Sequence, residues 1–206
     1  MLLNLINNPQ QFVAYLTALL AAITIHEYAH AWMANRLGDP TAKDLGRLSF
    51  NPLAHLDPLG TLFLLLAGFG WGKPVPVNSS NLKNEVIDNI KISLAGPFSN
   101  LIFAFLLGLI IKFIPLPTLT FNFFVIIIII NLVLMVFNLL PIPPLDGSHI
   151  LELFLPKDIF YLLRQFGLMI LFFLLIFSNT FPLLNTIISA TISIFFEVIF
   201  KIPVQL

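Results

Sequence analysis

Long apolar runs separated by short polar stretches dominate the chain. A membrane-crossing helix needs about 20 apolar residues, because the hydrocarbon core of a bilayer is about 30 Å thick. Five runs predict transmembrane helices, at residues 11–33, 92–114, 121–140, 160–177 and 181–200. The fourth fits least well, since Arg164 and Gln165 lie near its start. A further run, 59–69, is too short to span and predicts a re-entrant or interfacial segment.

The composition supports a membrane protein. Of the 206 residues 58% are hydrophobic and 10% are charged, whereas about a quarter of a soluble domain is charged. These values exclude a soluble globular domain and a disordered chain. Ten basic and ten acidic residues give zero net charge, so no nucleic-acid partner is expected. Since cysteine is absent, disulfides, a thiol nucleophile and cysteine-ligated zinc are excluded.

The basic residues predict the orientation of the chain, because cytoplasmic loops carry an excess of Lys and Arg. Each predicted helix crosses the membrane, so every second loop lies on the same side. Most of the basic residues fall on one side, and Lys112 alone lies on the other. The sequence therefore predicts an external N-terminus and a cytoplasmic position for the loops that hold the following residues: Arg36, Lys43, Arg47, Lys83, Lys91, Lys157, Arg164 and Lys201.

A metal-binding motif lies inside the first apolar run, where residues 26–30 read HEYAH. Positions i and i+4 share a helix face, so His26 and His30 can reach one ion, and Glu27 can act as general base toward water. An ionisable residue at this depth is costly and indicates function. Small residues at 14, 18 and 22 continue the face that carries both histidines, which predicts that it packs against other helices.

A catalytic zinc ion usually has three protein ligands, so a third must come from elsewhere. Asp146 is the best candidate, because the prolines of NLLPIPPLDG (138–147) break the third helix at the depth of the histidines. Glu152 is an alternative, but it lacks this proline-broken setting. The other candidates are His55, Asp57, His149 and Glu197.

HEYAH, NLLPIPPLDG and the segments GRLSFNPLAHLDPLGT, GWGKPVPVN and SLAGPFSN resemble the site-2 protease family of intramembrane zinc metalloproteases, in its compact prokaryotic branch without a PDZ domain. The resemblance implies one Zn²⁺ per chain, held by His26, His30 and Asp146, with Glu27 activating water. Asn138 matches a family asparagine that is thought to hold the substrate strand or the oxyanion. Residues 70–78 match a membrane-associated β-hairpin that pairs with the unwound substrate through Lys73, Pro74, Val75, Pro76 and Val77.

We therefore expect an all-α polytopic membrane protein with about five transmembrane helices, a short re-entrant segment and a small β-hairpin. It would form one protease domain over 1–206, with a catalytic core at about 10–155 and a C-terminal helical hairpin at 160–201. The resemblance implies hydrolysis of transmembrane substrates in a prokaryotic inner or plasma membrane, near the cytoplasmic side. The alternative is a metal transporter or channel that uses the same His and Asp residues. The sequence indicates no particular oligomeric state.

Overall fold

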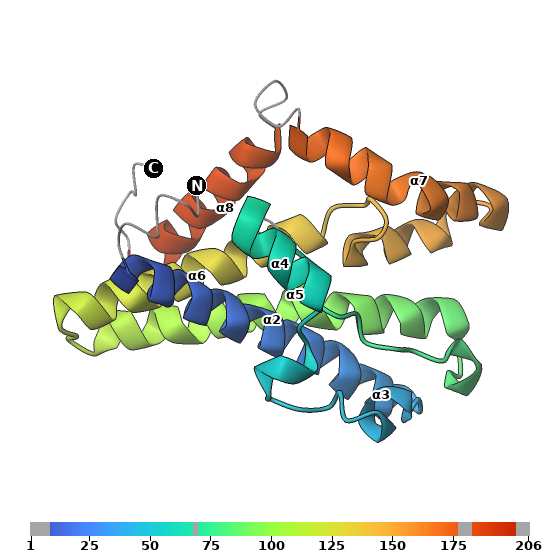
Figure 1. The fold of residues 1–206 in the computed structure, drawn as a ribbon, viewed down its shortest axis with the longest axis horizontal. Helices are drawn as coiled ribbons and strands as arrows, with labels where there is room; N and C mark the ends of the chain where they lie inside the picture. Colours follow the sequence, from blue (N-terminus) through green and yellow to red (C-terminus); the bar gives the residue numbers. More distant parts are fainter. Residues whose placement is uncertain (1–8, 68–69, 177–182, 201–206) are drawn as a thin grey trace.

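The computed structural model of the protein describes residues 9–67, 70–176 and 183–200. Helices account for all the regular structure of these residues, as predicted (Figure 1). In chain order they are α2 (Pro9–Leu37), α3 (Thr41–Asp44), η1 (Pro52–Ala54), α4 (Pro58–Ala67), η2 (Ser79–Asn81), α5 (Glu85–Phe113), α6 (Thr118–Asn138), η3 (Asp146–Leu153), α7 (Lys157–Ile176) and α8 (Leu183–Phe200), where η denotes a 3-10 helix.

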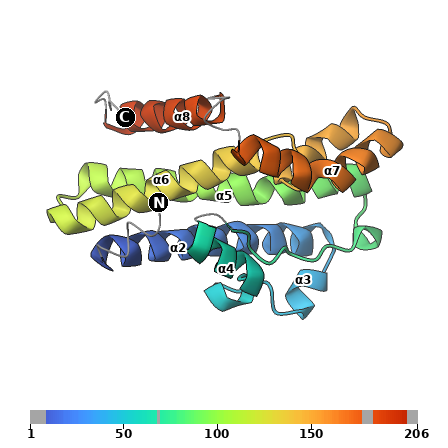
Figure 2. The same cartoon turned by 45° about the horizontal axis from the view of Figure 1, so that its top comes forward.

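Helices α2, α5 and α6 form the centre of the fold, and each of them packs against the other two. Contacts from Ala22 to Asn100 and from His30 to Ile92 show that α2 and α5 run antiparallel. In Figure 2, α2 lies on one side of the α5–α6 layer, and α7 and α8 lie on the other. Helix α8 packs against α6 and α5, and α7 packs against η3. The packing of these three helices therefore brings His26 and His30 of α2 close to Asp146, which follows α6 in the chain.

The small-residue face of α2 turns inward, as the sequence predicts. Ala18 and Ala22 are fully buried, and Ala18 belongs to an apolar cluster built mainly from α5, α6 and α8. Small side chains allow close approach between helices in a membrane, where lipid offers no hydrophobic driving force for association. This face continues directly into His26 and His30, which are also buried. The packing that joins α2 to α5 therefore carries both imidazoles into the protein.

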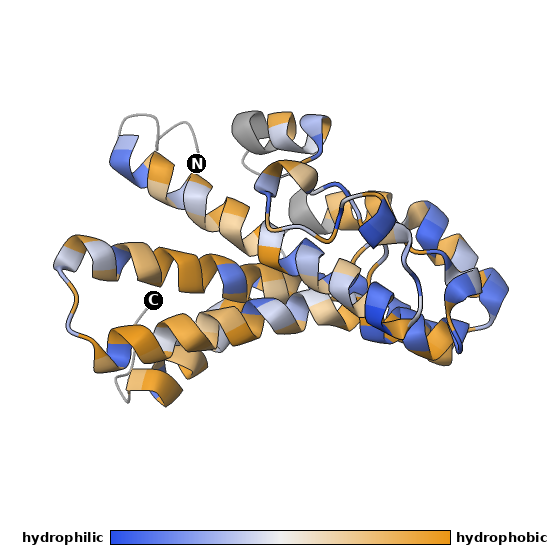
Figure 3. Cartoon of the chain, turned by 90° about the horizontal axis from the view of Figure 1, so that it is seen from below, coloured by the Kyte–Doolittle hydropathy of each residue, from blue (hydrophilic) through white to orange (hydrophobic). Residues whose placement is uncertain are grey.

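The chain is a multi-pass membrane protein. Four helices, α2, α5, α6 and α8, are long and apolar enough to cross a membrane within the part of the chain that the structure describes. Hydrophilic residues gather toward one end of the bundle, and hydrophobic residues dominate the other (Figure 3). The predicted fourth span is helical as α7, but it is not among these four, so its crossing of the membrane stays a prediction. The turn expected between the last two spans, at 178–180, lies outside the described residues.

The predicted β-hairpin does not appear among the described residues. Residues 70–78 form an extended segment whose one bridge joins Gly72 to Leu56, and Lys73 N–H donates to the His55 carbonyl at 2.8 Å. Pro74 and Pro76 lack the N–H groups that a regular ladder needs. The expected re-entrant segment is likewise not supported. In its place is α4, a helix of ten residues and about 15 Å.

A buried carboxylate ties this extended segment to the end of α2. Gly38, at φ +108°, ends the helix in a conformation that favours glycine, and Asp39 follows, fully buried. Its carboxylate accepts hydrogen bonds from Asn78 N at 2.8 Å, Asn81 Nδ2 at 2.8 Å and Thr41 Oγ1 at 2.5 Å. Burial disfavours the charged form, but the hydrogen bonds from Thr41, Asn81 and Asn78 outweigh it and hold the pKa of Asp39 below its ordinary value.

Replacing Asp39 by Asn is therefore expected to destabilise the fold in a pH-dependent manner. A carboxyl whose pKa is depressed by folding stabilises the protein above its unfolded pKa, and this contribution disappears as the pH falls through the folded pKa. The loss should be about 1–3 kcal/mol at pH 7 and should shrink below about pH 4. Unfolding in detergent micelles would measure it, with Asp44→Asn, on the exposed face of α3, as the control. An equal loss at both pH values would contradict this assignment.

Candidate metal centre

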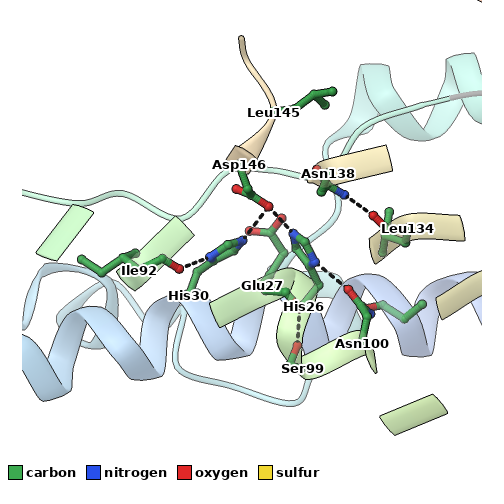
Figure 4. Close-up of polar contacts among 12 residues, drawn as sticks. His26, Glu27, His30, Ile92, Ser99, Asn100, Leu134, Asn138, Leu145 and Asp146 are labelled. Carbon is green, nitrogen blue, oxygen red and sulfur yellow. Dashed lines mark hydrogen bonds and ion pairs between the residues drawn. The ribbon is translucent and has the colours of Figure 1, made fainter. Parts of the chain in front are cut away.

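Three side chains from two distant parts of the chain meet at the inner face of α2. The Nε2 atoms of His26 and His30 lie 3.1 Å and 3.4 Å from Asp146 Oδ2. One ligand atom from each residue falls within 4.8 Å of the others, so the three could hold one metal ion. Figure 4 shows both imidazoles pointing toward the carboxylate from α2, while Asp146 enters from the start of η3. These are the residues that the sequence selects.

The other nitrogen of each imidazole is committed to a hydrogen bond that fixes its proton. His30 Nδ1 lies 2.7 Å from the Ile92 carbonyl, which can only accept, so Nδ1 carries the proton. His26 Nδ1 lies 2.7 Å from Asn100 Oδ1. The Asn100 amide is oriented by its Nδ2, which donates to the Ala22 carbonyl at 3.0 Å, so its oxygen must face His26. Each imidazole therefore leaves its Nε2 facing Asp146, where it can coordinate a metal ion (Figure 4).

This arrangement fits a cation. Two imidazole nitrogens and one carboxylate face one another, and Asp146 Oδ2 is buried without a hydrogen-bond partner. A buried carboxylate oxygen without a partner is costly, and a bound cation removes the cost. Two neutral imidazoles and one carboxylate are a ligand set that catalytic zinc uses, with a further position left for water or substrate. His26, His30 and Asp146 would hold the ion, and its chemistry would be that of a Lewis acid.

Asp146 reaches the histidines because α6 stops at Asn138 and the chain turns back. Prolines at 141, 143 and 144 prevent the helix from continuing. Gly147 then packs directly against the backbone of the helix end, where an added Cβ would overlap the carbonyls of Leu139 and Leu140. Close approach at Gly147 thus sets the start of η3, and with it Asp146, against α6.

Gly96 performs the corresponding function on α5. A Cβ at this position would overlap both the His30 ring and the His26 ring. The absence of a side chain lets the two imidazoles approach the α5 backbone closely, where Ile92 and Asn100 are within hydrogen-bond distance. The motif on α2 therefore supplies the two imidazoles, and the surface of α5 holds them in position.

Glu27 lies beside the three ligands without joining them. Its carboxylate is drawn next to the imidazoles in Figure 4, and its Oε2 is buried with no hydrogen-bond partner. The Arg47 guanidinium approaches it, with Nη2 3.9 Å from Oε2. Burial lowers the pKa of Arg47 and the neighbouring Glu27 carboxylate opposes that shift. Because the ordinary value lies far above neutrality, Arg47 stays charged.

A cavity of about 1080 Å³ opens beside the four residues of the centre and is lined by all of them. Pro74, Val75 and Val77 of the extended segment line it as well, whereas Lys73 and Pro76 do not. Asn138 also lines it, and its Nδ2 donates to the Leu134 carbonyl of its own helix at 2.9 Å. The structure therefore brings most of the predicted substrate-binding residues to the same space as the predicted ligands.

The remaining metal candidates make other contacts. Glu152 pairs with His149 at 2.6 Å, and both line the cavity without belonging to a metal-ligand cluster among the described residues. His55 is fully buried, with its Nε2 2.7 Å from the Ser49 carbonyl. The Asp57 carboxylate accepts from Gly60 N at the start of α4. Glu197 is exposed on α8.

Sequence reasoning missed three residues that support the centre: Asn100, Asn131 and Arg47. Asn100 and Asn131 are fully buried, and Asn100 Nδ2 donates to Asn131 Oδ1 at 2.8 Å. Their amides stand inside long apolar runs, where an unpaired polar group is costly, and that placement could have indicated a role. Arg47 was used only to predict orientation, and nothing in its local sequence indicates its burial.

Membrane-spanning helices that bring two imidazoles and a carboxylate together, beside a buried glutamate, define a membrane-embedded metallohydrolase. A model of peptidase family M50 matches residues 116–178. "Putative zinc metalloprotease YwhC" of Bacillus subtilis is 44% identical over 161 residues, which are 73% of this chain and 74% of the relative. "Putative zinc metalloprotease Rip2" of Mycolicibacterium smegmatis is 32% identical over 175 residues, which are 80% of this chain and 67% of the relative. No solved structure matches the chain.

The chain therefore belongs to peptidase family M50, the site-2 protease family, and is a zinc metalloprotease. The family resemblance given by its motifs is confirmed. The alternative of a metal transporter or channel is set aside, because the relatives are named as proteases.

Substituting Gly96 by Ala tests whether α5 builds the centre. The added methyl group would push both imidazoles out of place, so zinc affinity should fall about 10- to 100-fold, as when supporting contacts of a metal ligand are lost. Zinc titration of the metal-depleted protein would measure this. Gly108→Ala on the same helix is the control, because its Cβ would meet Phe195 and Ile199 at 3.3–3.4 Å, away from the centre. Equal affinities in the two variants would show that Gly96 does not position the ligands.

Proposed function

We propose that this metalloprotease cleaves peptide bonds within or next to transmembrane helices of other membrane proteins, with zinc held by His26, His30 and Asp146. The observation that carries the proposal is the convergence of two imidazole nitrogens and a carboxylate oxygen on a cavity between helices that are long and apolar enough to span a membrane. Helical substrates shield their carbonyls by internal hydrogen bonds, so the substrate must unwind locally before it can be cut. A cavity of about 1080 Å³ has room for a short extended peptide.

Glu27 acts as the general base in this mechanism. Zinc in such a ligand set supplies a Lewis acid that polarises a carbonyl and acidifies water. Glu27 accepts the proton of the attacking water on its unpartnered Oε2 and later returns a proton to the leaving amine. His26 and His30 would hold the ion through Nε2, because their Nδ1 atoms are engaged by Asn100 and by the Ile92 carbonyl.

The extended segment Lys73–Pro74–Val75–Pro76–Val77 presents one edge to the substrate. In an extended chain, the N–H groups of residues i and i+2 point to the same side. Prolines remove the N–H groups of 74 and 76, which leaves those of Val75 and Val77 on the other edge. Both valines line the cavity, and no hydrogen bond to either backbone N–H is found in the described part of the chain. A substrate strand added to this edge would form backbone hydrogen bonds with it, in place of those lost when the substrate helix unwinds.

Asn138 is the residue that we assign to holding the substrate or the oxyanion. One N–H of its amide is used within α6, by the bond to Leu134. A carboxamide has a second N–H and an acceptor oxygen. Since the side chain borders the cavity, these groups are available to a peptide bound beside the metal ligands.

We infer that the catalytic end of the protein faces the cytoplasm. Arg36 ends α2, Lys43 lies in α3, and Lys91 lies in the first two turns of α5. Because α2 and α5 are antiparallel, these residues lie at one end of the bundle, and Lys112 lies at the other. Water would reach Glu27 from this polar end. The proposed catalytic core covers about 10–155, and α7 and α8 would form the C-terminal helical hairpin at 160–201. Leu168 and Leu171 of α7 line the cavity beside this core.

Replacing Glu27 by Gln should keep zinc bound and abolish most cleavage. The amide cannot accept the proton from water, and loss of a general base lowers the rate by about 10²–10⁴-fold. Cleavage of a single-span substrate in proteoliposomes and zinc content per chain would be measured together. The control is Glu152→Gln, the same substitution in a residue that lines the same cavity but pairs with His149. Wild-type cleavage by Glu27→Gln would exclude Glu27 as the base, and loss of zinc would make it a ligand.

A further inference from the structure

A buried arginine lies between the metal centre and the extended segment, and the mechanism above gives it no role. Arg47 belongs to the loop between α3 and η1, and 5% of its surface is exposed. Burying a guanidinium is costly unless it is paired and hydrogen-bonded. The partners that Arg47 has found therefore indicate what its position serves.

Two of those partners are successive carbonyls of the extended segment. Arg47 Nη2 donates to Lys73 O at 2.5 Å, and Nη1 donates to Pro74 O at 3.0 Å. The planar fork of a guanidinium presents its donors in fixed directions, so two such bonds define both the position and the orientation of the chain that they hold. Residues 73 and 74 lie next to Val75 and Val77 in the same segment, and both valines line the cavity.

The third partner is the Glu27 carboxylate, 3.9 Å from Arg47 Nη2. This separation is too long for a hydrogen bond but close enough for a strong charge–charge attraction at a buried site. Arg47 thus attracts the carboxylate without occupying the acceptor site of Oε2, which has no hydrogen-bond partner. One guanidinium therefore touches the segment that would bind substrate and also lies beside the group that would remove the proton from water.

We propose that Arg47 is a positioning residue that sets the register between the substrate strand and the metal centre. By holding the Lys73 and Pro74 carbonyls relative to Glu27, it fixes where a peptide paired with Val75 and Val77 presents its scissile carbonyl. The role rests on the proposed function, because it requires a substrate strand on this edge. Misplacement of reacting groups by about 1 Å can cost about 10²-fold in rate, so such a link has a large effect on activity.

The test uses the absence of cysteine from the chain. Val75→Cys introduces a single thiol, and a transmembrane substrate with one cysteine next to its cleavage site can form a disulfide with it under a mild oxidant. Crosslinking is measured in the zinc-loaded Glu27→Gln background, in which the substrate stays intact. Arg47→Ala, Arg47→Lys and the control Lys43→Ala, exposed on α3, are compared. The same Arg47 and Lys43 variants are assayed for KM, kcat and zinc content with Glu27 and Val75 restored.

Arg47→Ala should lower crosslinking and kcat/KM at least about tenfold, with a raised KM and unchanged zinc content. Arg47→Lys should recover part of both, because one ammonium keeps the charge but cannot reproduce the fork. Lys43→Ala should match the wild type. A residue that merely stabilised the fold would lower zinc content and active fraction while leaving KM unchanged.

Wild-type crosslinking and KM in Arg47→Ala would overturn the role of Arg47 and leave the substrate strand intact. If Arg47→Ala loses zinc, Arg47→Lys becomes the deciding variant. Retained zinc with a raised KM in Arg47→Lys would support the role, and wild-type kinetics would refute it. If Val75→Cys fails to crosslink even with Arg47 present, the strand assignment itself is wrong, whereas the Glu27→Gln result would still stand by itself.

Discussion

Two imidazole nitrogens and a carboxylate oxygen that converge inside the bundle are the constraint on which this structure depends. The Nδ1 atoms of His26 and His30 are engaged by Asn100 and by the Ile92 carbonyl, so the opposite nitrogens face Asp146. A bundle that buries such a group gains nothing from it unless a cation binds. Three features bring these atoms together: the small-residue face of α2, Gly96 on α5 and the break after α6. This arrangement suits the metal site of a zinc metalloprotease.

The three proposed ligands could be identified from the sequence, and the residues that hold them in place could not. Residues spaced i and i+4 share a helix face whatever the fold, so His26 and His30 are legible locally. Asp146 is identified by a second argument: a carboxylate that follows three helix-breaking prolines at membrane depth is costly and indicates a functional site. Asn100, Gly96 and the Ile92 carbonyl act only because α5 packs antiparallel to α2, and no local pattern specifies which turn of α5 meets which turn of α2.

The extended segment shows where the family resemblance is wrong. Pro74, Pro76 and the valines beside them favour extended backbone, whereas the hairpin that the resemblance implies is not found in the described residues. The segment is held by Arg47 and by Asp39, both of which are buried and lie far from it in the chain. Side chains thus replace the partner strand beside the cavity that Pro74, Val75 and Val77 line. The fold of this loop depends on two charged residues whose burial only the three-dimensional structure reveals.

X-ray absorption spectroscopy of the zinc-loaded protein tests the central claim most directly. The account predicts zinc bound by two imidazoles and by oxygen at about 2.0–2.2 Å. The Asp146→Ala variant should lose the metal or replace the carboxylate by water, with both imidazoles retained. A wild-type spectrum with one imidazole, or with three, would contradict the assignment of His26, His30 and Asp146 as the ligands.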